Sequence, residues 1–552
     1  MLSRIASLVL LLSNLSPTHA VPHIHRSVSP TATVGNTQVT GTTNSTTNIE
    51  FFGGIPFAYP PLGSLRFQPP VLQKSIPGNI ATFNATSFGN ACYQLNFTDT
   101  MSEDCLTVNI FRPAGISSNS KLPVMFWTYG GGFHSGASSS FDASTLVGRS
   151  VSRGTPIIYV STNYRLGPLG FPQGNEADAT GSVNLGIKDL LAALNWVQTN
   201  IQTFGGDSTR VTMFGQSAGA IMSSITFLDS QVSGLARAAI LSSGSAATSP
   251  AFTAPQHESL WQSFVVGVPS CASVATSGST LDCMKNASVG DLMASYAAVG
   301  TTGWMPVIDG SGGVFPAIPS TLFAQGRYSK IPFISGDVLD EGTIFVTQVS
   351  GLNYSSAFIK KQFTAAYSPP LVTAAELSSK IDEILALYPD DPALGSPYNT
   401  GNETFGLNSG WKRATAIFGD LGFQSTRRMW LQTAAAGGSK VYGYLLTQPQ
   451  LGDPSLGVDH TSTKKYLYGD LLSDGVASDA VLSTMMMDYW ISFADCLDPN
   501  DGKGAERPTW GQYTASNNVL MQLNGSNATM IEDDYRSEGM AAINADPLVF
   551  FH

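Results

Sequence analysis

A serine between two glycines is the residue of this chain best suited to nucleophilic chemistry. Gly215-Gln216-Ser217-Ala218-Gly219 has the spacing G-x-S-x-G, after an apolar run and before a run that can be helical. At a sharp strand-to-helix turn the serine backbone is strained, so the positions two before and two after it must be small. Chance matches also occur in a chain with 55 glycines, but the strand before and the helix after favour this turn. Ser217 is therefore the predicted nucleophile of an acyl-transfer site.

A serine nucleophile needs a base, and His460 is the predicted one. It lies in "LGVDHTSTKKYLYGD", a loop that follows the strand-like run "KVYGYLLT". The other six histidines are excluded by their positions. His19 lies in the leader, and His23 and His25 lie at the start of the mature chain. His134 belongs to the glycine run, His257 comes before any plausible acid, and His552 is the last residue. We expect His552, as the terminal residue, to be mobile.

The G-x-S-x-G turn resembles the nucleophile turn of α/β-hydrolases, whose triad follows the chain order nucleophile, acid, base. This resemblance implies that the acid that orients the base lies between Ser217 and His460. "FISGDVLDEGTIF" offers Asp337, Asp340 and Glu341 just after a predicted strand. The residues themselves do not choose among the three, and solvated loop acids would look the same.

Three glycines in "YGGGFHSGASSS", residues 129–140, follow the predicted strand "LPVMFWTY". Acyl transfer develops negative charge on the carbonyl oxygen, and fixed backbone N–H groups there lower the barrier by several kcal/mol. A glycine run alone is more often a flexible turn. Beside an elbow serine it predicts N–H donors for the oxyanion.

Strand-like and helix-like runs alternate along the chain, which predicts an α/β fold with a large, mostly parallel sheet flanked by helices. The runs at 155–164, 210–217, 237–244 and 331–337 are apolar or β-branched, as expected of strands covered on both faces. Residues 184–201 have helical spacing, and the segment from 21 to 47 is expected to trail or to form edge hairpins.

The N-terminus resembles a secretory leader, predicted as residues 1–20, and no later stretch has the roughly 18 apolar residues of a membrane span. A net charge of −11 argues against nucleic acid as a partner. Five cysteines suit an oxidising compartment. Spacing groups four of them as Cys92 with Cys105 and Cys271 with Cys283, and leaves Cys496, which we expect to be buried in a helix. Glycosylation is predicted at the Asn-x-Ser/Thr sequons Asn44, Asn84, Asn96, Asn286, Asn353, Asn402, Asn524 and Asn527.

Together these motifs resemble the type-B carboxylesterase/lipase family, which has the α/β-hydrolase fold and includes fungal secreted lipases. The resemblance spans nearly the whole mature chain. It rests on "FGGDSTRVTMFGQSAG" around the serine and on "FFGGIPFAYPPLGSLRFQPP", "EDCLTVNIFRP", "NYRLGPLGF" and "MMMDYWISFADCLDPND".

The resemblance implies a role for each matching residue. Ser217, Glu341 and His460 match the catalytic triad, and Gly131, Gly132 and Ala218 match the oxyanion donors. Cys92–Cys105 and Cys271–Cys283 match two family disulfides, and Arg66 with Glu103 matches a structural ion pair. The family needs neither a metal nor an organic cofactor.

Two departures from the family stand out. Gln216 occupies a position where many relatives have Glu, and residues 93–104 form a short loop where lipases of the family have a helical flap. At about 1.5 Å per residue this loop makes at most about 18 Å of helix, too little for a flap with hinges.

The sequence thus predicts a signal peptide, 1–20, and one α/β-hydrolase domain, 21–552, with a helical cap inserted after Cys271. The expected function is a secreted serine hydrolase that cleaves carboxylic esters through an acyl-enzyme. General, lipid, sterol or feruloyl esters all remain open as substrates, as does the oligomeric state. The alternative is a catalytically inactive, esterase-like binding or adhesion protein.

Overall fold

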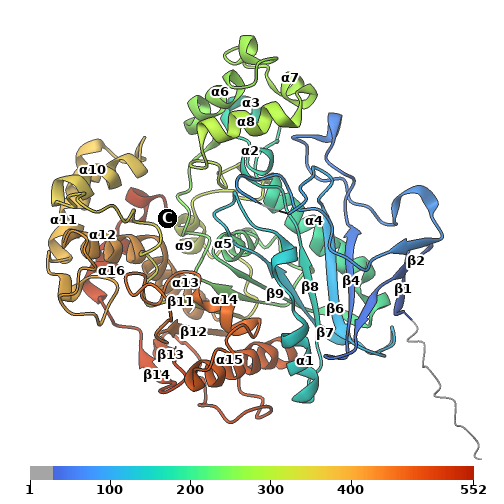
Figure 1. Ribbon diagram of the computed structural model, residues 1–552. Helices are drawn as coiled ribbons and strands as arrows, with labels where there is room; N and C mark the ends of the chain where they lie inside the picture. Colours follow the sequence, from blue (N-terminus) through green and yellow to red (C-terminus); the bar gives the residue numbers. More distant parts are fainter. Residues whose placement is uncertain (1–28, 98) are drawn as a thin grey trace, which may run out of the picture.

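An eleven-stranded mixed sheet runs through the part of the chain that the computed structural model describes, residues 29–552 except Thr98. Its strand order is β14-β13-β12-β11-β10-β9-β7-β8-β6-β4-β3. The six neighbouring pairs from β8 through β13 are parallel, and the pairs outside them are antiparallel. Figure 1 shows the sheet with helices on both sides. The predicted fold class is confirmed, and the predicted leader lies outside the described residues.

The strands of the large sheet are β3 (Thr42–Asn44), β4 (Ile49–Pro56), β6 (Thr107–Pro113), β7 (Leu122–Thr128), β8 (Ile158–Thr162), β9 (Gly206–Gln216), β10 (Ala238–Ser242), β11 (Phe333–Val338), β12 (Val441–Leu446), β13 (Val519–Leu523) and β14 (Thr529–Glu532). A small sheet contains β1 (Thr31–Val34), β2 (Thr37–Thr40) and β5 (Thr82–Asn84). The predicted N-terminal hairpin is therefore present, as β1 paired antiparallel with β2.

The helices are α1 (Ser144–Ser152), α2 (Gly167–Gly170), α3 (Gly174–Ala179), α4 (Leu185–Asn200), α5 (Ala218–Ile225), α6 (Glu258–Val266), α7 (Leu281–Asn286), α8 (Val289–Val299), α9 (Pro319–Ala324), α10 (Ser356–Ala366), α11 (Ala374–Leu387), α12 (Gly410–Gly419), α13 (Ser425–Ala436), α14 (Ser462–Leu467), α15 (Ala477–Cys496) and α16 (Ser537–Ala545). A π-helical turn, Asp420–Gln424, joins α12 to α13.

The central strands are buried throughout and mostly apolar because helices cover both of their faces. Every residue of β8, β10, β11 and β12 is buried. A fully buried strand has no polar face to expose, so the alternation typical of half-exposed strands is missing from these runs. Continuous apolar runs therefore identified these strands correctly.

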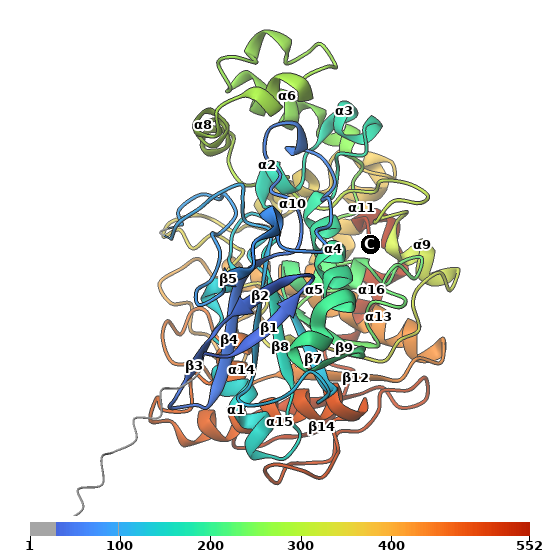
Figure 2. The same ribbon diagram turned by 90° about the vertical axis from the view of Figure 1, so that its right-hand side faces the viewer.

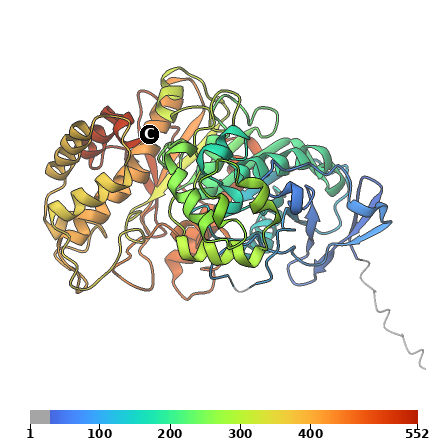
Figure 3. The same ribbon diagram turned by 90° about the horizontal axis from the view of Figure 1, so that it is seen from above.

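A helical cap of α6, α7 and α8 lies beyond the carboxyl ends of the parallel strands, at the top of Figures 1 and 2. Figure 3, seen from above, places it over the middle of the sheet. The cap has its own hydrophobic core, which includes Trp261, Phe264 and Trp304. It begins at Glu258, before Cys271, so the predicted start of the cap was too late.

Both predicted disulfides are present, Cys92–Cys105 and Cys271–Cys283. Cys496 ends α15 but is exposed, so the prediction of burial was wrong. No helix among the described residues is long and apolar enough to cross a membrane.

Candidate active site

Ser217 occupies the turn between β9 and α5, in the conformation that the motif predicts. Its φ of 57° and ψ of −130° lie outside the regions that non-glycine residues ordinarily adopt. The turn is held because the Ser217 N–H donates to the Ser242 carbonyl at 2.9 Å, at the end of the neighbouring strand β10. Strain of this kind places the side chain above the sheet at the first turn of α5.

The two glycines of the motif are required by close backbone contacts. A Cβ at Gly215 would lie 2.7 Å from the carbonyl carbon of Gly219. A Cβ at Gly219 would overlap the carbonyl oxygen of Thr128 at the end of β7. The elbow therefore fits only with glycine on both sides of the serine.

His460 lies in the loop between β12 and α14, and its imidazole is buried. Its Nδ1 contacts the Glu341 carboxylate, which is also buried. Its Nε2 is buried and has no hydrogen-bond partner among the described residues. Phe345 and Phe423 pack against the ring, with centroids 4.9 Å and 4.7 Å away. The imidazole is thus held on one nitrogen and free on the other.

The three acids at the end of β11 and just after it have three different environments; Asp337 lies in the strand, and Asp340 and Glu341 follow it. Glu341 accepts from the Val338 N–H at 2.8 Å with one oxygen and contacts His460 with the other. Asp340 accepts from the backbone N–H groups of Tyr398 and Val458, at 2.8 Å and 2.9 Å. It therefore joins the loop that precedes His460 to the end of the sheet.

Asp337 points into a different cluster, where it accepts from Arg427 Nε at 3.0 Å. Burial, and next repulsion from the Glu341 carboxylate, raise the pKa of Asp337 to about 8, although Arg427 opposes this. Burial likewise raises the pKa of Asp340 to about 6, against its hydrogen bonds. Glu341 is thus the one of the three that faces the base.

The glycine loop after β7 lies directly against the elbow. A Cβ on Gly130 would be 2.8 Å from the Cβ of Ser217. Gly131 and Gly132 have φ values of 106° and 62°, which favour glycine. Within residues 29–552 except Thr98, their N–H groups donate to no protein acceptor. The N–H of Ala218 belongs to the first turn of α5, where helical N–H groups have no partner inside the helix.

Gln216, the departure from the family motif, connects the elbow to the base. Its side chain is buried, and Nε2 donates to the His460 carbonyl at 2.7 Å. The sequence marked this position as unusual, but its contact with the base loop could not be seen there.

An apolar cavity of about 310 Å³ shares one wall residue, Phe345, with the surroundings of the base. Phe345, which packs on His460, and Phe418 line the cavity, together with Leu352, Phe358 and Ala414. Phe345 also stacks on Phe418, with ring centroids 5.2 Å apart. Phe345 thus connects the base to the wall of this cavity.

Three other predictions concern the last histidine, one ion pair and the glycosylation sequons. His552 is buried against Phe550 and is not the mobile terminus we expected, since its backbone carbonyl accepts from Ser320. Arg66 and Glu103 form the expected ion pair at 2.6 Å. Seven sequon asparagines are exposed and one, Asn524, is half-buried; the exposed ones are Asn44, Asn84, Asn96, Asn286, Asn353, Asn402 and Asn527.

A strained serine after β9, a histidine loop after β12 and an acid after β11 place this molecule among the α/β-hydrolases. Two solved structures have the same fold. Aspergillus niger EstA has a TM-score of 0.80 and 25% identity, over 95% of this chain and 99% of that one. PNB esterase has a TM-score of 0.74 and 27% identity, over 94% and 100%.

Residues 28–542 match the model of the carboxylesterase family, and the chain belongs to that family. Secreted lipase 1 of Botryotinia fuckeliana is 33% identical, over 96% of this chain and 95% of its own length. Lipase 1 of Geotrichum candidum is also 33% identical, over 95% and 96%. The protein is accordingly a carboxylic ester hydrolase. These comparisons give no support to the inactive alternative.

Proposed function

We propose that Ser217, His460 and Glu341 hydrolyse carboxylic esters through an acyl-enzyme. Ser217 Oγ attacks the ester carbonyl carbon while His460 Nε2 takes its proton, and Glu341 accepts the Nδ1 hydrogen and stabilises the imidazolium. The N–H groups of Gly131, Gly132 and Ala218 bind the oxyanion. The alcohol leaves with the proton from Nε2, and water then repeats the sequence to release the acid.

One observation carries this proposal. The His460 ring is held by Glu341 on Nδ1 and has Nε2 without a partner, although both atoms are buried. A buried nitrogen without a partner costs free energy, and a role in the reaction is one reason for a protein to keep it. The His460 carbonyl accepts a hydrogen bond from Gln216, the residue before Ser217. This bond joins the loop of the base to the serine turn and supports Ser217 as the residue that His460 deprotonates.

Rapid mixing with p-nitrophenyl butyrate tests the mechanism. Acyl-enzyme formation predicts a burst of p-nitrophenol, of at most one equivalent per chain, before the steady rate. Ser217→Ala should abolish the burst and lower kcat by about 10³-fold or more. A folded Ser217→Ala variant that keeps the burst would disprove the proposal.

The substrate is proposed to be an ester with an apolar acyl or alcohol part, because Phe345 both packs on the base and lines an apolar cavity. Ala414→Trp should fill part of the cavity and lower kcat/KM for p-nitrophenyl octanoate more than for the acetate. Ala436→Trp, on the exposed end of α13, serves as the control. Equal losses for both esters in Ala414→Trp would refute the assignment of the cavity.

The protein is further proposed to work outside the cell, with residues 21–552 as one catalytic domain. Relatives named as secreted lipases support this location, and exposed sequons are compatible with glycosylation. Expression in a fungal host should release active enzyme into the medium, in a form whose mass falls on treatment with an N-glycosidase. Retention of all activity inside the cells would contradict the proposal.

A further inference from the structure

The oxyanion loop, residues 129–136, carries Gly131 and Gly132 and is fixed to the rest of the molecule at several points. One of these contacts comes from the loop that the Cys92–Cys105 disulfide closes. Tyr164 Oη donates to the Tyr129 carbonyl at 2.9 Å, and the Gly167 N–H donates to the Phe133 carbonyl at 2.9 Å. The remaining contact at Gly136 is made by Gln94, two residues after Cys92.

Gln94 holds Gly136 by both of its backbone groups. The Gly136 N–H donates to Gln94 Oε1 at 2.8 Å, and Gln94 Nε2 donates to the Gly136 carbonyl at 2.9 Å. Gln94 Nε2 also donates to the Cys92 carbonyl at 3.1 Å, and the side chain is 2% exposed. Gly136 cannot be held by a side chain of its own, because a Cβ there would lie 2.5 Å from the Tyr129 ring. A buried side-chain amide that bonds both the N–H and the carbonyl of one residue fixes the position of that residue.

The contact at Gly136 reaches the proposed oxyanion donors through Ser135. The Ser135 N–H and Oγ both donate to the Gly131 carbonyl, each at 3.0 Å. This carbonyl and the Gly132 N–H belong to the same planar peptide unit, in which they point in opposite directions. Fixing the Gly131 carbonyl therefore fixes the direction of the Gly132 N–H. The His134 N–H also donates to this carbonyl, at 3.2 Å, so a shift of Ser135 and Gly136 would remove two of the three bonds that orient the donor.

Gln94 is itself on a loop that cannot swing freely. The Cys92–Cys105 disulfide closes the loop, and both cysteines are buried. Glu103 pairs with Arg66, which also donates to the backbone carbonyls of Met284 and Ala287 in and after α7 of the cap. Gln94 is thus attached to the oxyanion loop, and Glu103 is attached, through Arg66, to the cap.

We propose that Gln94 is a positioning residue that sets the geometry of the oxyanion hole, and that the Cys92–Cys105 disulfide and the Glu103–Arg66 ion pair act as a fixed brace for it. The inference rests on the proposed function, because the hole is assigned there. Its consequence is that the oxyanion donors are arranged before substrate binds.

The test compares ligands that do and do not form an oxyanion. An alkyl trifluoromethyl ketone adds to Ser217: the Oγ–carbon bond forms, the carbonyl electron pair moves to oxygen, and the serine proton moves to His460. The matching trifluoromethyl carbinol fills the same space without forming this adduct. Gln94→Ala should lower kcat and ketone affinity together, by about 10- to 100-fold. KM and carbinol affinity should stay within about twofold.

Two further variants separate positioning from general stability. Gln94→Glu keeps the side-chain volume but has no amide donor for the Gly136 carbonyl, and should show the same split if Gln94→Ala does not fold. Gln448 is the matched control, because it is equally buried and also accepts a glycine N–H, from Gly525 at 2.8 Å. Gln448→Ala should lower Tm without changing kcat or ketone affinity.

Removing the disulfide provides an independent test of the brace. Cys92→Ser with Cys105→Ser should lower kcat, and adding Gln94→Ala to that pair should cost little more, because all three changes release the same brace. A folded Gln94 variant with unchanged kcat, or with equal losses for ketone and carbinol, would overturn the inference. Wild-type enzyme that does not bind the ketone more tightly than the carbinol would instead overturn the proposed function, and the inference with it.

Discussion

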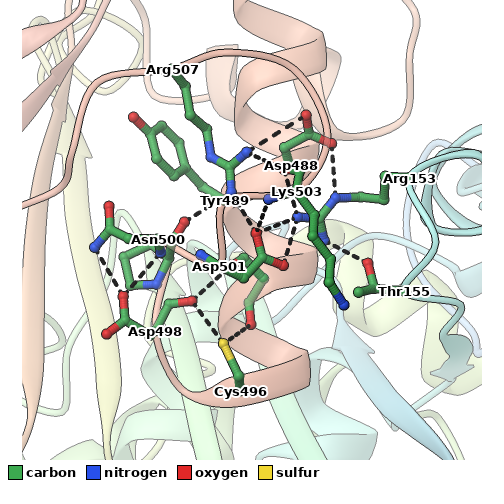
Figure 4. A network of polar contacts seen from close by, with 12 residues as sticks. Arg153, Thr155, Asp488, Tyr489, Cys496, Asp498, Asn500, Asp501, Lys503 and Arg507 are labelled. Carbon is green, nitrogen blue, oxygen red and sulfur yellow. Dashed lines mark hydrogen bonds and ion pairs between the residues drawn. The ribbon is translucent and has the colours of Figure 1, made fainter.

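Two buried polar clusters lie at opposite ends of the parallel strands, and they are built in opposite ways. The proposed triad follows the carboxyl ends of β9, β11 and β12. The other cluster joins the turn before β8, at an amino end, to α15 and the loop after it (Figure 4). Asp488 faces Arg149, Arg153 and Arg507 there, and Asp501 faces Arg153 and Arg507.

The difference lies in which charges and donors are matched. In the arginine–aspartate cluster each carboxylate is faced by at least two guanidinium groups, the shortest contact being 2.6 Å. At the proposed active site His460 Nε2 and the Gly131 and Gly132 N–H groups have no acceptor or donor among the described residues. Matched charges hold a fold together, whereas unmatched, fixed groups are available to a transition state. Burial alone does not distinguish the two clusters.

Glu341→Gln should have the largest effect among the substitutions that test this contrast. The amide cannot stabilise the imidazolium or hold the required tautomer, so kcat should fall by about 10³-fold or more. Asp340→Asn should lower kcat less, since Asp340 contacts the loop before His460 rather than the ring. Asp337→Asn should lower kcat least, because Asp337 contacts Arg427 instead. Steady-state kinetics with one soluble ester measures all three, and equal losses would refute Glu341 as the acid.

Gln216→Ala should have an intermediate effect. Removing the bond from Gln216 Nε2 to the His460 carbonyl loosens the base but leaves all three triad groups in place. We expect kcat to fall by about 10-fold, with KM little changed. Gln173→Ala, which also removes a buried amide that donates to backbone carbonyls, is the control. The assignment is wrong if both variants lose the same activity.

Asp488→Asn should affect stability and not the chemistry. Arg149 loses its carboxylate partner, Arg153 and Arg507 keep only Asp501, and breaking a buried pair costs about 3 kcal/mol of unfolding free energy. Urea unfolding should show this loss, while kcat per folded molecule stays at the wild-type value. A fall in kcat as large as that of Gln216→Ala would remove the distinction between the clusters.

The pH dependence of stability should reveal Asp337. Glu341, Arg427 and Asp533 surround it, and burial raises its pKa to about 8 from an ordinary 3.8. The folded chain therefore binds a proton that the unfolded chain has lost, so this contribution to stability is present at low pH and disappears as pH rises from about 4 to about 8. Asp337→Asn should lose less stability than wild type over that window. Parallel curves for the two proteins would contradict the assignment.

Local sequence signals predicted the parts of the site that depend on local geometry. The glycines around Ser217 are required by contacts within one turn and the strand beside it, so their spacing was informative. Buried strands such as β8 and β10 were visible as apolar runs. The position of His460 followed from elimination and chain order, not from any signal in its own loop.

Contacts between distant segments could not be predicted in this way. Asp337, Asp340 and Glu341 lie at or just after the end of one strand, and the residues alone left the choice open because it depends on where residues 458–460 lie. Gln94 and Gly136 are far apart in sequence, in loops without periodicity. His552 was misjudged because burial of a chain end depends on packing against helices elsewhere.

The most direct test of the central claim is to locate the nucleophile chemically. A p-nitrophenyl alkylphosphonate should react with Ser217 Oγ, displace p-nitrophenolate and leave one phosphonyl group per chain, with activity falling in proportion to labelling. Mass spectrometry of the digested protein should find that group on Ser217, and the Gln94→Ala and Glu341→Gln variants should label more slowly. A label on another residue, or full activity after complete labelling of Ser217, would contradict the account.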